Sequence, residues 1–136
     1  MIGLDTNVLV RYLAADDPVQ SPQARELIAG CLRGGEGIFV STVTLVETVW
    51  TLRRTYRVPL AGVCEKVTAL ANTEGVRLAD ADAVSWAASL ATATGCDFAD
   101  VLIAELGRRA GCAHTATFDT DATRKLDAMR SVADSQ

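Results

Sequence analysis

The amino-acid sequence predicts an α/β fold with a mostly parallel sheet that helices cover on both faces. Short apolar runs, typical of buried strands, lie at residues 1–4, 38–40, 76–79 and 114–118. Longer stretches with apolar residues at helical spacing separate them, and Gly, Pro or Asp residues mark the boundaries. Strands that alternate with helices favour a parallel sheet of four strands, or of five if a weak run at 129–132 joins it.

Four helices are expected in the first half of the chain, each opened by a capping residue or a proline. The first follows the strand at 1–4 directly, and Asp16-Asp17-Pro18 breaks it. The glycine-rich residues 34–37 end the second helix. The expected starts are Thr6 or Asn7, Pro22, Ser41 or Thr42, and Pro59.

Three more helices are expected in the second half. An alanine-rich helix follows the strand at 76–79, and another precedes the strand at 114–118, whose residues alternate with β-branched ones. A short helix then leads towards the weak last strand. The expected starts are about Asp80, Asp97 and Asp121, and the first two helices end at Gly95 and near Gly111.

Length and composition predict one globular domain over residues 1–136. The sequence is 49% hydrophobic and 22% charged, a composition that excludes a disordered chain. Only the last few polar residues are expected to be disordered. No apolar stretch is long enough to span a bilayer and no signal segment opens the sequence, so the expected location is the cytoplasm.

Charge and cysteine usage limit the functional classes. A net charge of −4 counts against tight, non-specific binding of long nucleic acid. It leaves room for a metal-bridged phosphodiester substrate, because bound cations would offset the acidic groups. The cysteines are too far apart for a zinc site or a redox pair and are expected to be core residues; they are Cys31, Cys64, Cys96 and Cys112.

Acidic side chains lie where predicted strands are followed by helices. In a parallel sheet these points share one crevice, where ligands bind. Carboxylates gathered there would repel one another unless a cation lies between them, and oxygen ligands suit Mg²⁺ or Mn²⁺. The sequence therefore predicts a divalent-metal enzyme whose candidate ligands are Asp5, Glu47, Asp100 and Asp119.

The two acids in the first half also have structural interpretations. Asp5 could be a plain helix cap, but Thr6 and Asn7 could cap equally well, so a functional role is favoured. Glu47 could pair with Arg54, but seven residues separate them, which is too far for a helical pair. Its apolar neighbours would make an unpaired glutamate costly, which again favours a function.

The acids in the second half are harder to separate. Asp97 and Asp100 are spaced like a capping box, in which Asp97 would be the cap and Asp100 the ligand. Asp119 directly follows a strand, and Asp121 would cap the next helix. Whether Asp97 or Asp121 joins the site stays open. Thr117 shares a strand face with Asp119 and could hydrogen-bond a carboxylate or a metal-bound water.

Other chemistry finds less support. His114 is the only histidine and is expected to be a packing residue, so histidine-dependent mechanisms are disfavoured. No glycine-rich phosphate loop or nucleophile elbow is present. The basic cluster of Arg53, Arg54 and Arg57 is expected to face solvent, with phosphate contact as the second interpretation.

With these motifs in order along its length, the chain resembles the PIN-domain ribonucleases. It is most similar to the VapC-type toxins of bacterial type II toxin–antitoxin pairs, and the similarity runs essentially from end to end. The resemblance implies a three-layer sandwich with a central, mostly parallel, four- or five-stranded sheet flanked by helices. The motifs are Asp5-Thr6-Asn7-Val8-Leu9, Val46-Glu47, Asp97-Phe98-Ala99-Asp100-Val101-Leu102-Ile103-Ala104 and Thr117-Phe118-Asp119.

The resemblance also implies a function. The chain would be a Mg²⁺- or Mn²⁺-dependent endoribonuclease that leaves a 5′-phosphate and a 3′-hydroxyl. It would form a homodimer, and a VapB-type antitoxin would neutralise it by laying a C-terminal segment across the active-site groove. The metal-binding and catalytic residues would be Asp5, Glu47, Asp100 and Asp119, supported by Thr6, Thr117 and Asn7, the last of which orients the active-site backbone.

Two alternatives remain. An aspartate-nucleophile phosphatase would use Asp5 to form a phospho-aspartate, but such enzymes usually have a second Asp at the position of Asn7. A non-catalytic RNA- or protein-binding module on the same scaffold would be expected to lack a metal ligand, whereas all four acids are present. The RNA target, the antitoxin, and the number and identity of the metal ions stay open.

Overall fold

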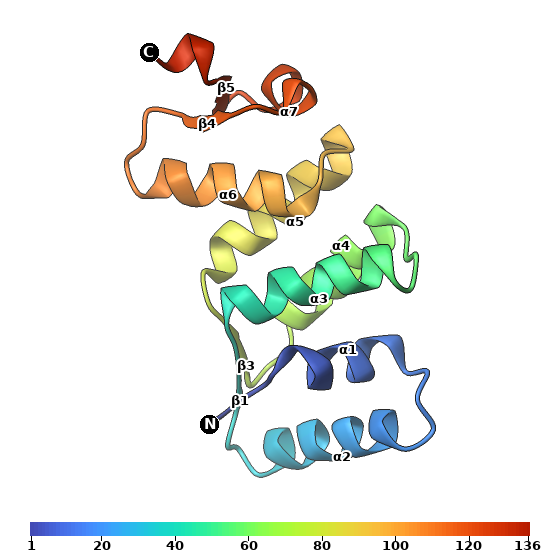
Figure 1. Ribbon diagram of the computed structural model, residues 1–136. Helices are drawn as coiled ribbons and strands as arrows, with labels where there is room; N and C mark the ends of the chain where they lie inside the picture. The colour runs from blue at the N-terminus through green and yellow to red at the C-terminus, as the bar shows by residue number, and fades with distance from the viewer. The chain divides into compact units, whose positions relative to one another are not determined.

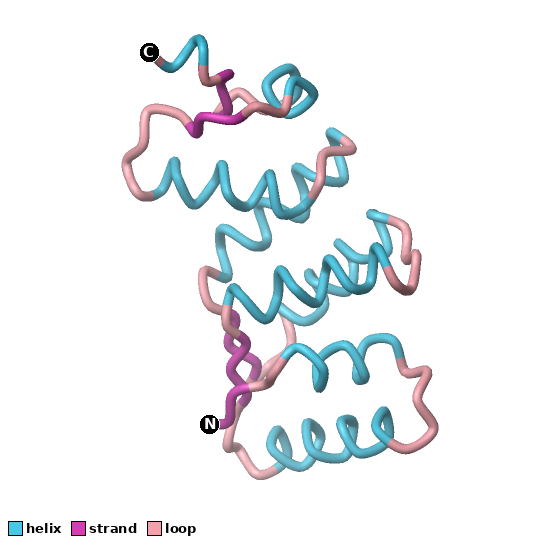
Figure 2. Tube along the Cα trace, in the orientation of Figure 1, coloured by secondary structure: helices cyan, strands magenta, loops and turns pink.

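The computed structural model describes residues 1–136. The chain divides into two compact units, Met1–Ala81 and Asp82–Gln136, which we call the first and the second unit and describe separately. Figure 1 follows the chain through both units, and Figure 2 shows that helices make up most of it. None of the seven helices has the length and apolar character that a bilayer crossing would require.

The first unit contains a three-stranded parallel sheet in the order β1-β2-β3. β2 is the central strand, and its side chains Ile38 and Val40 are fully buried. Ile38 lies opposite Ile2 on one side and Val76 on the other. The strands are β1 (Ile2–Gly3), β2 (Ile38–Val40) and β3 (Val76–Leu78).

Four helices pack around this sheet. α1 and α2 form an antiparallel pair, and α1 also packs against α3 (Figure 1). Their apolar faces supply the core of the unit, with Leu9, Leu45, Leu52 and Val63 almost entirely inaccessible to solvent. The helices are α1 (Thr6–Ala14), α2 (Gln20–Arg33), α3 (Thr42–Arg54) and α4 (Leu60–Ala71).

The second unit is built on two longer helices, whose buried residues include Val84, Phe98 and Leu102. A two-stranded parallel sheet and a short helix follow them, with Thr115 opposite Met129 in the sheet. The elements are α5 (Ala81–Thr94), α6 (Phe98–Arg109), β4 (Thr115–Thr117), α7 (Thr120–Lys125), β5 (Met129–Ser131) and a 3₁₀ helix at Ala133–Ser135.

The α/β class and the parallel pairing of the strands are confirmed, but the expected single sheet of four or five strands is wrong. The five strands form a three-stranded and a two-stranded sheet. Each strand is only two or three residues long, so an apolar run identifies a strand without identifying its partner. The weakly marked strand at 129–131 pairs with β4, and this ladder belongs to the second unit.

Two smaller expectations also need correction. Asp119, not Asp121, is the N-cap of α7, so that helix begins earlier than expected. Cys31, Cys64 and Cys96 are buried, as expected for core residues, but Cys112 is exposed. It follows the last turn of α6, at the surface, where its side chain contributes no core packing.

The second unit buries one carboxylate that the sequence did not single out. Glu105 on α6 is only 4% exposed. Its Oε1 accepts hydrogen bonds from Arg108 Nη2 and Arg109 Nε, both at 2.8 Å, and its Oε2 accepts one from Arg108 Nε at 3.0 Å. These two arginines lower the pKa of Glu105 to about 2, Arg108 having the larger influence.

Candidate metal-binding and catalytic site

Asp5 lies one residue beyond β1, separated from it by Leu4, at the carboxyl end of the three-stranded sheet. It is itself the N-cap of α1, and its Oδ1 accepts a hydrogen bond from the Thr6 backbone N–H at 2.7 Å. The expectation that Thr6 or Asn7 would serve as the cap is therefore wrong. Capping occupies one carboxylate oxygen only, and Oδ2 has no hydrogen-bond partner within the unit, so the cap and a ligand role are compatible.

Thr6 connects the start of α1 to Glu47 on α3. Its hydroxyl donates to Glu47 Oε2 at 2.7 Å, across 41 positions of the sequence. One turn earlier on α3, the Thr44 hydroxyl donates to the carbonyl oxygen of Leu4 at 3.3 Å, in a buried position. These two contacts fasten the β1–α1 junction to the beginning of α3, so Asp5 and Glu47 lie at the same end of the sheet.

Glu47 lies on an exposed face of α3. Its neighbours one turn away, Val43 and Trp50, are 68% and 59% exposed, and the Arg54 guanidinium stacks over the Trp50 ring at 5.5 Å. The argument that apolar neighbours would desolvate Glu47 is therefore wrong, because these neighbours are themselves in solvent. What orients the carboxylate is the Thr6 hydroxyl.

Asp100 lies in the first turn of α6, three residues after the residue that caps this helix. Asp97 is that cap, as expected, and its Oδ1 accepts hydrogen bonds from the backbone N–H groups of Ala99 and Asp100. Partial burial, followed by the negative charges of Asp97 and Asp119, raises the pKa of Asp100. The second unit thus brings Asp100 and Asp119 close enough for their charges to interact.

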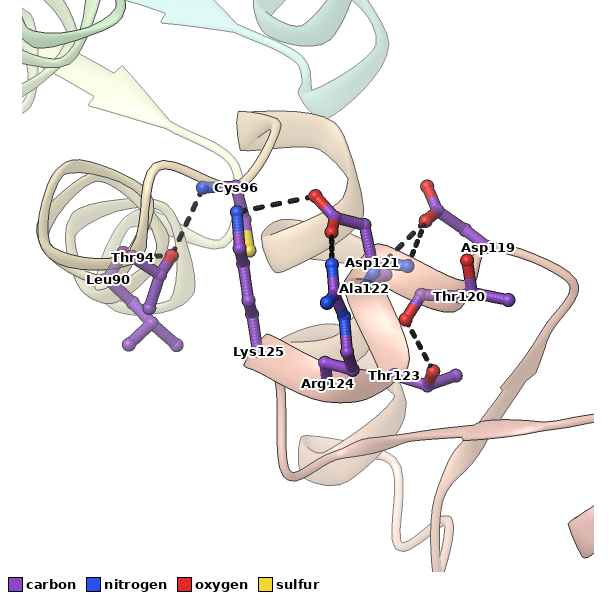
Figure 3. A network of polar contacts seen from close by, with 10 residues as sticks. All are labelled: Leu90, Thr94, Cys96, Asp119, Thr120, Asp121, Ala122, Thr123, Arg124 and Lys125. Atoms are coloured by element: carbon purple, nitrogen blue, oxygen red, sulfur yellow. Dashed lines mark hydrogen bonds and ion pairs between the residues drawn. The ribbon is translucent and has the colours of Figure 1, made fainter.

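Asp119 occupies a position that parallels that of Asp5. Only Phe118 separates it from β4, and its Oδ1 accepts hydrogen bonds from the backbone N–H groups of Asp121 at 2.9 Å and Ala122 at 3.0 Å (Figure 3). Thr117 Oγ1 accepts a hydrogen bond from the Asp119 backbone N–H at 3.0 Å. Thr117 therefore supports the backbone of Asp119 and does not contact its carboxylate.

The two acids whose role was left open differ in their contacts. Asp97 uses one carboxylate oxygen to cap α6, as Asp5 does for α1, so its part in the site stays open. Asp121 pairs with Arg124 and, at 3.3 Å from its Oδ2, with Lys125 Nζ (Figure 3). These two cations, Arg124 first, lower the pKa of Asp121. A carboxylate that is already neutralised is a poor candidate for a metal ligand, so Asp119 is a better candidate than Asp121.

The donor set fits a hard divalent cation. Asp5, Glu47, Asp100 and Asp119 each keep at least one carboxylate oxygen free of hydrogen bonds within their own unit. Oxygen-only ligands are what Mg²⁺ and Mn²⁺ prefer. Neither unit by itself groups three or more His, Cys, Asp or Glu side chains that could hold a metal ion. Asp5 and Glu47 belong to the first unit, and Asp100 and Asp119 belong to the second.

Sequence reasoning missed Arg11 and Tyr56, which line a cleft of about 350 Å³ beside Asp5. Arg11 lies one helical turn after Asn7, and both side chains line this cleft, so helical spacing could have indicated Arg11. None of the basic residues that were singled out lines the cleft; those residues are Arg53, Arg54 and Arg57.

Comparison with known proteins agrees with these observations. The family model of the PIN domain matches residues 2–128, which include parts of both units and all four candidate acids. No curated protein matches the chain. PIN domains are typically nucleases that act on nucleic acid and generally use divalent metal ions. The chain therefore belongs to the PIN-domain family.

Proposed function

We propose that the chain is a Mg²⁺- or Mn²⁺-dependent endoribonuclease of the VapC type. Asp5, Glu47, Asp100 and Asp119 would act together on an RNA phosphodiester bond. The observation that carries the proposal is the Thr6–Glu47 hydrogen bond. It joins two motifs that are distant in the sequence and holds two of the four acids at one end of a parallel sheet, where ligands bind in this class of fold.

Each residue has a role that its geometry supports. A divalent cation, when bound, lowers the pKa of a water molecule and stabilises the departing 3′-oxygen. Asp5, Asp100 and Asp119 offer free carboxylate oxygens that would hold the cation. Glu47, oriented by the Thr6 hydroxyl, would hold it as well or position the attacking water. The expected products are a 5′-phosphate and a 3′-hydroxyl.

The biological role we propose is that of a cytoplasmic toxin in a toxin–antitoxin pair. The support is the end-to-end order of the motifs, from Asp5-Thr6-Asn7 to Thr117-Phe118-Asp119. As a toxin the protein would form a homodimer and be neutralised by a VapB-type antitoxin. Induced expression in bacteria should then stop growth, and co-expression of a small protein from the neighbouring reading frame should restore it.

An RNA cleavage assay tests the chemistry. Wild-type protein should cleave RNA in Mg²⁺ or Mn²⁺, and EDTA should abolish the activity. Asp5→Asn should lose about a hundred- to a thousandfold in rate, a typical cost of removing one electrostatic group from an active site. It should stay folded, because Asn is as good a helix cap as Asp.

The control for Asp5→Asn is a thermal melt, which should match that of the wild type. Cleavage that survives both EDTA and Asp5→Asn would contradict the proposal. RNA binding without any cleavage would instead favour the non-catalytic binding module, and a trapped phospho-enzyme would favour the phosphatase.

A further inference from the structure

The cleft beside Asp5 continues past the proposed catalytic residues. The part of about 350 Å³ is lined by the start of α1 and the end of α3. A second cleft of about 290 Å³ shares Asn7 and Arg11 with it and runs on along α1 towards Gln20, Gln23 and Leu27 of α2. The two adjoining clefts therefore extend from Asp5 along α1, as the binding of a polymeric ligand requires.

Arg11 is held in place between these two clefts. Its Nη1 donates to the Tyr56 hydroxyl oxygen at 3.0 Å, and its Nε donates to Gln20 Oε1 at 2.8 Å. Arg11 also forms an ion pair with Asp16, whose Oδ1 is 3.7 Å from Nη1, and it interacts with the charge of Asp17. The Arg11 side chain remains 33% exposed, and its Nη2 group makes no hydrogen bond within the first unit.

Other hydrogen-bond donors along the cleft are also free. The Tyr56 hydroxyl accepts from Arg11 and so keeps its own proton to donate. The side chains of Asn7 and Thr55 line the cleft and make no hydrogen bond within the first unit. A fixed guanidinium surrounded by unused neutral donors is suited to an anion with several acceptor oxygens.

We propose that Arg11, together with Tyr56, binds the RNA backbone phosphate next to the phosphodiester that is cleaved at Asp5. This inference rests on the proposed function, because that function supplies the RNA strand. Asp5 and Arg11 line the same cleft, so a strand whose scissile phosphate is near Asp5 would reach Arg11 within that cleft. Arginine and tyrosine commonly make such backbone contacts, which position a strand without reading its sequence.

The test is equilibrium binding of a fluorescent single-stranded RNA, measured by anisotropy in Mg²⁺. All variants carry Asp5→Asn, which removes cleavage and keeps the helix cap. Adding Arg11→Gln should weaken binding about tenfold, the value of one charge-assisted phosphate contact. It should also reduce the slope of log affinity against log salt by about 0.7, the contribution of one phosphate of a single strand. Tyr56→Phe should weaken binding about threefold.

The matched control is Arg33→Gln, which removes the same charge from an exposed position at the end of α2, outside both clefts. Equal affinity and equal salt slope for Arg11→Gln and Arg33→Gln would overturn the proposal. If Arg11→Gln fails to fold, Arg11→Lys and Tyr56→Phe are measured instead. Unchanged RNA affinity in both of these variants would overturn the proposal. It would also fail if an acidic peptide, but not RNA, lost affinity with Arg11→Gln.

Failure of this inference is distinct from failure of the proposed function. If the wild type cleaves RNA but Arg11→Gln binds it as the control does, the inference fails and the nuclease stands. If the wild type does not cleave RNA, the proposed function fails, whatever the binding result.

Discussion

α6 carries a carboxylate near each end, and the surroundings of the two differ. Glu105, in its C-terminal half, is buried and receives three hydrogen bonds from Arg108 and Arg109, so its pKa falls to about 2. Asp100, in its first turn, has no arginine or lysine partner within the second unit. Burial, together with the charges of Asp97 and Asp119, raises its pKa.

The protein therefore supplies a counter-charge to Glu105 but not to Asp100. A partly buried carboxylate next to other acids is destabilising unless something neutralises it. Glu105 is neutralised from its own helix and acts in stability. Asp100 has no such partner in the second unit, and under the proposed metal-dependent function a bound cation would supply the counter-charge.

The first comparison is between the two threonines that support the candidate acids, Thr6 and Thr117. Thr6→Val removes the only hydrogen bond that orients Glu47, and we expect cleavage to fall about 10- to 100-fold, the usual cost of losing a group that positions a metal ligand. Thr117→Val removes only an acceptor for the Asp119 backbone, and we expect about a fivefold loss. Steady-state cleavage rates measure both.

Both threonine variants should melt close to the wild type, since valine has the same shape and each contact is exposed. A Thr117→Val defect equal to or larger than that of Thr6→Val would show that the orientation of Glu47 is not what limits the reaction.

A smaller effect is expected on stability. Glu105→Gln removes the charge that pairs with Arg108 and Arg109, and it should lower the free energy of unfolding by about 1–2 kcal/mol, because both arginines are largely exposed and solvent screens the pairs. Denaturant unfolding at neutral pH measures this. The control is Glu65→Gln on α4, an exposed position without an ion pair, which should change stability by less than about 0.5 kcal/mol.

The difference in stability between the wild type and Glu105→Gln should depend on pH in a definite direction. The pKa of Glu105 is lower in the folded state, about 2, than its ordinary value of 4.5. Its stabilising contribution is therefore complete above pH 4.5 and is lost as the pH falls towards 2. The gap between wild type and Glu105→Gln should shrink over this window, and a gap that stayed constant down to pH 2 would count against the ion pairs. Asp100 acts in the opposite sense, since its raised pKa makes its protonation in acid favourable for folding.

Local patterns along the sequence predicted the elements well but not their partners. The cap Asp97 was predicted from side-chain chemistry alone, and Ser41 was one of the two caps expected for α3. It was not predicted that β4 pairs with β5 in a separate two-stranded sheet, because strands of three residues carry no information about register or neighbours.

In the candidate site, too, local patterns identified individual residues but not the contacts between them. Asp5 and Asp119 were identified because each follows a strand directly. The Thr6–Glu47 contact could not be predicted, because its partners are 41 residues apart. Helical spacing from Asn7 could have indicated the position of Arg11, but not its partners Gln20 and Tyr56, which are 9 and 45 residues away in the sequence.

The most direct test of the account is a calorimetric titration of Mn²⁺ into the wild type, Glu47→Gln and Asp100→Asn. These substitutions remove one acid from each unit. If the proposed metal-binding residues are correct, wild-type protein binds Mn²⁺ and each substitution weakens binding by at least about tenfold. Wild-type protein that binds no Mn²⁺, or an affinity that either substitution leaves unchanged, would contradict the account.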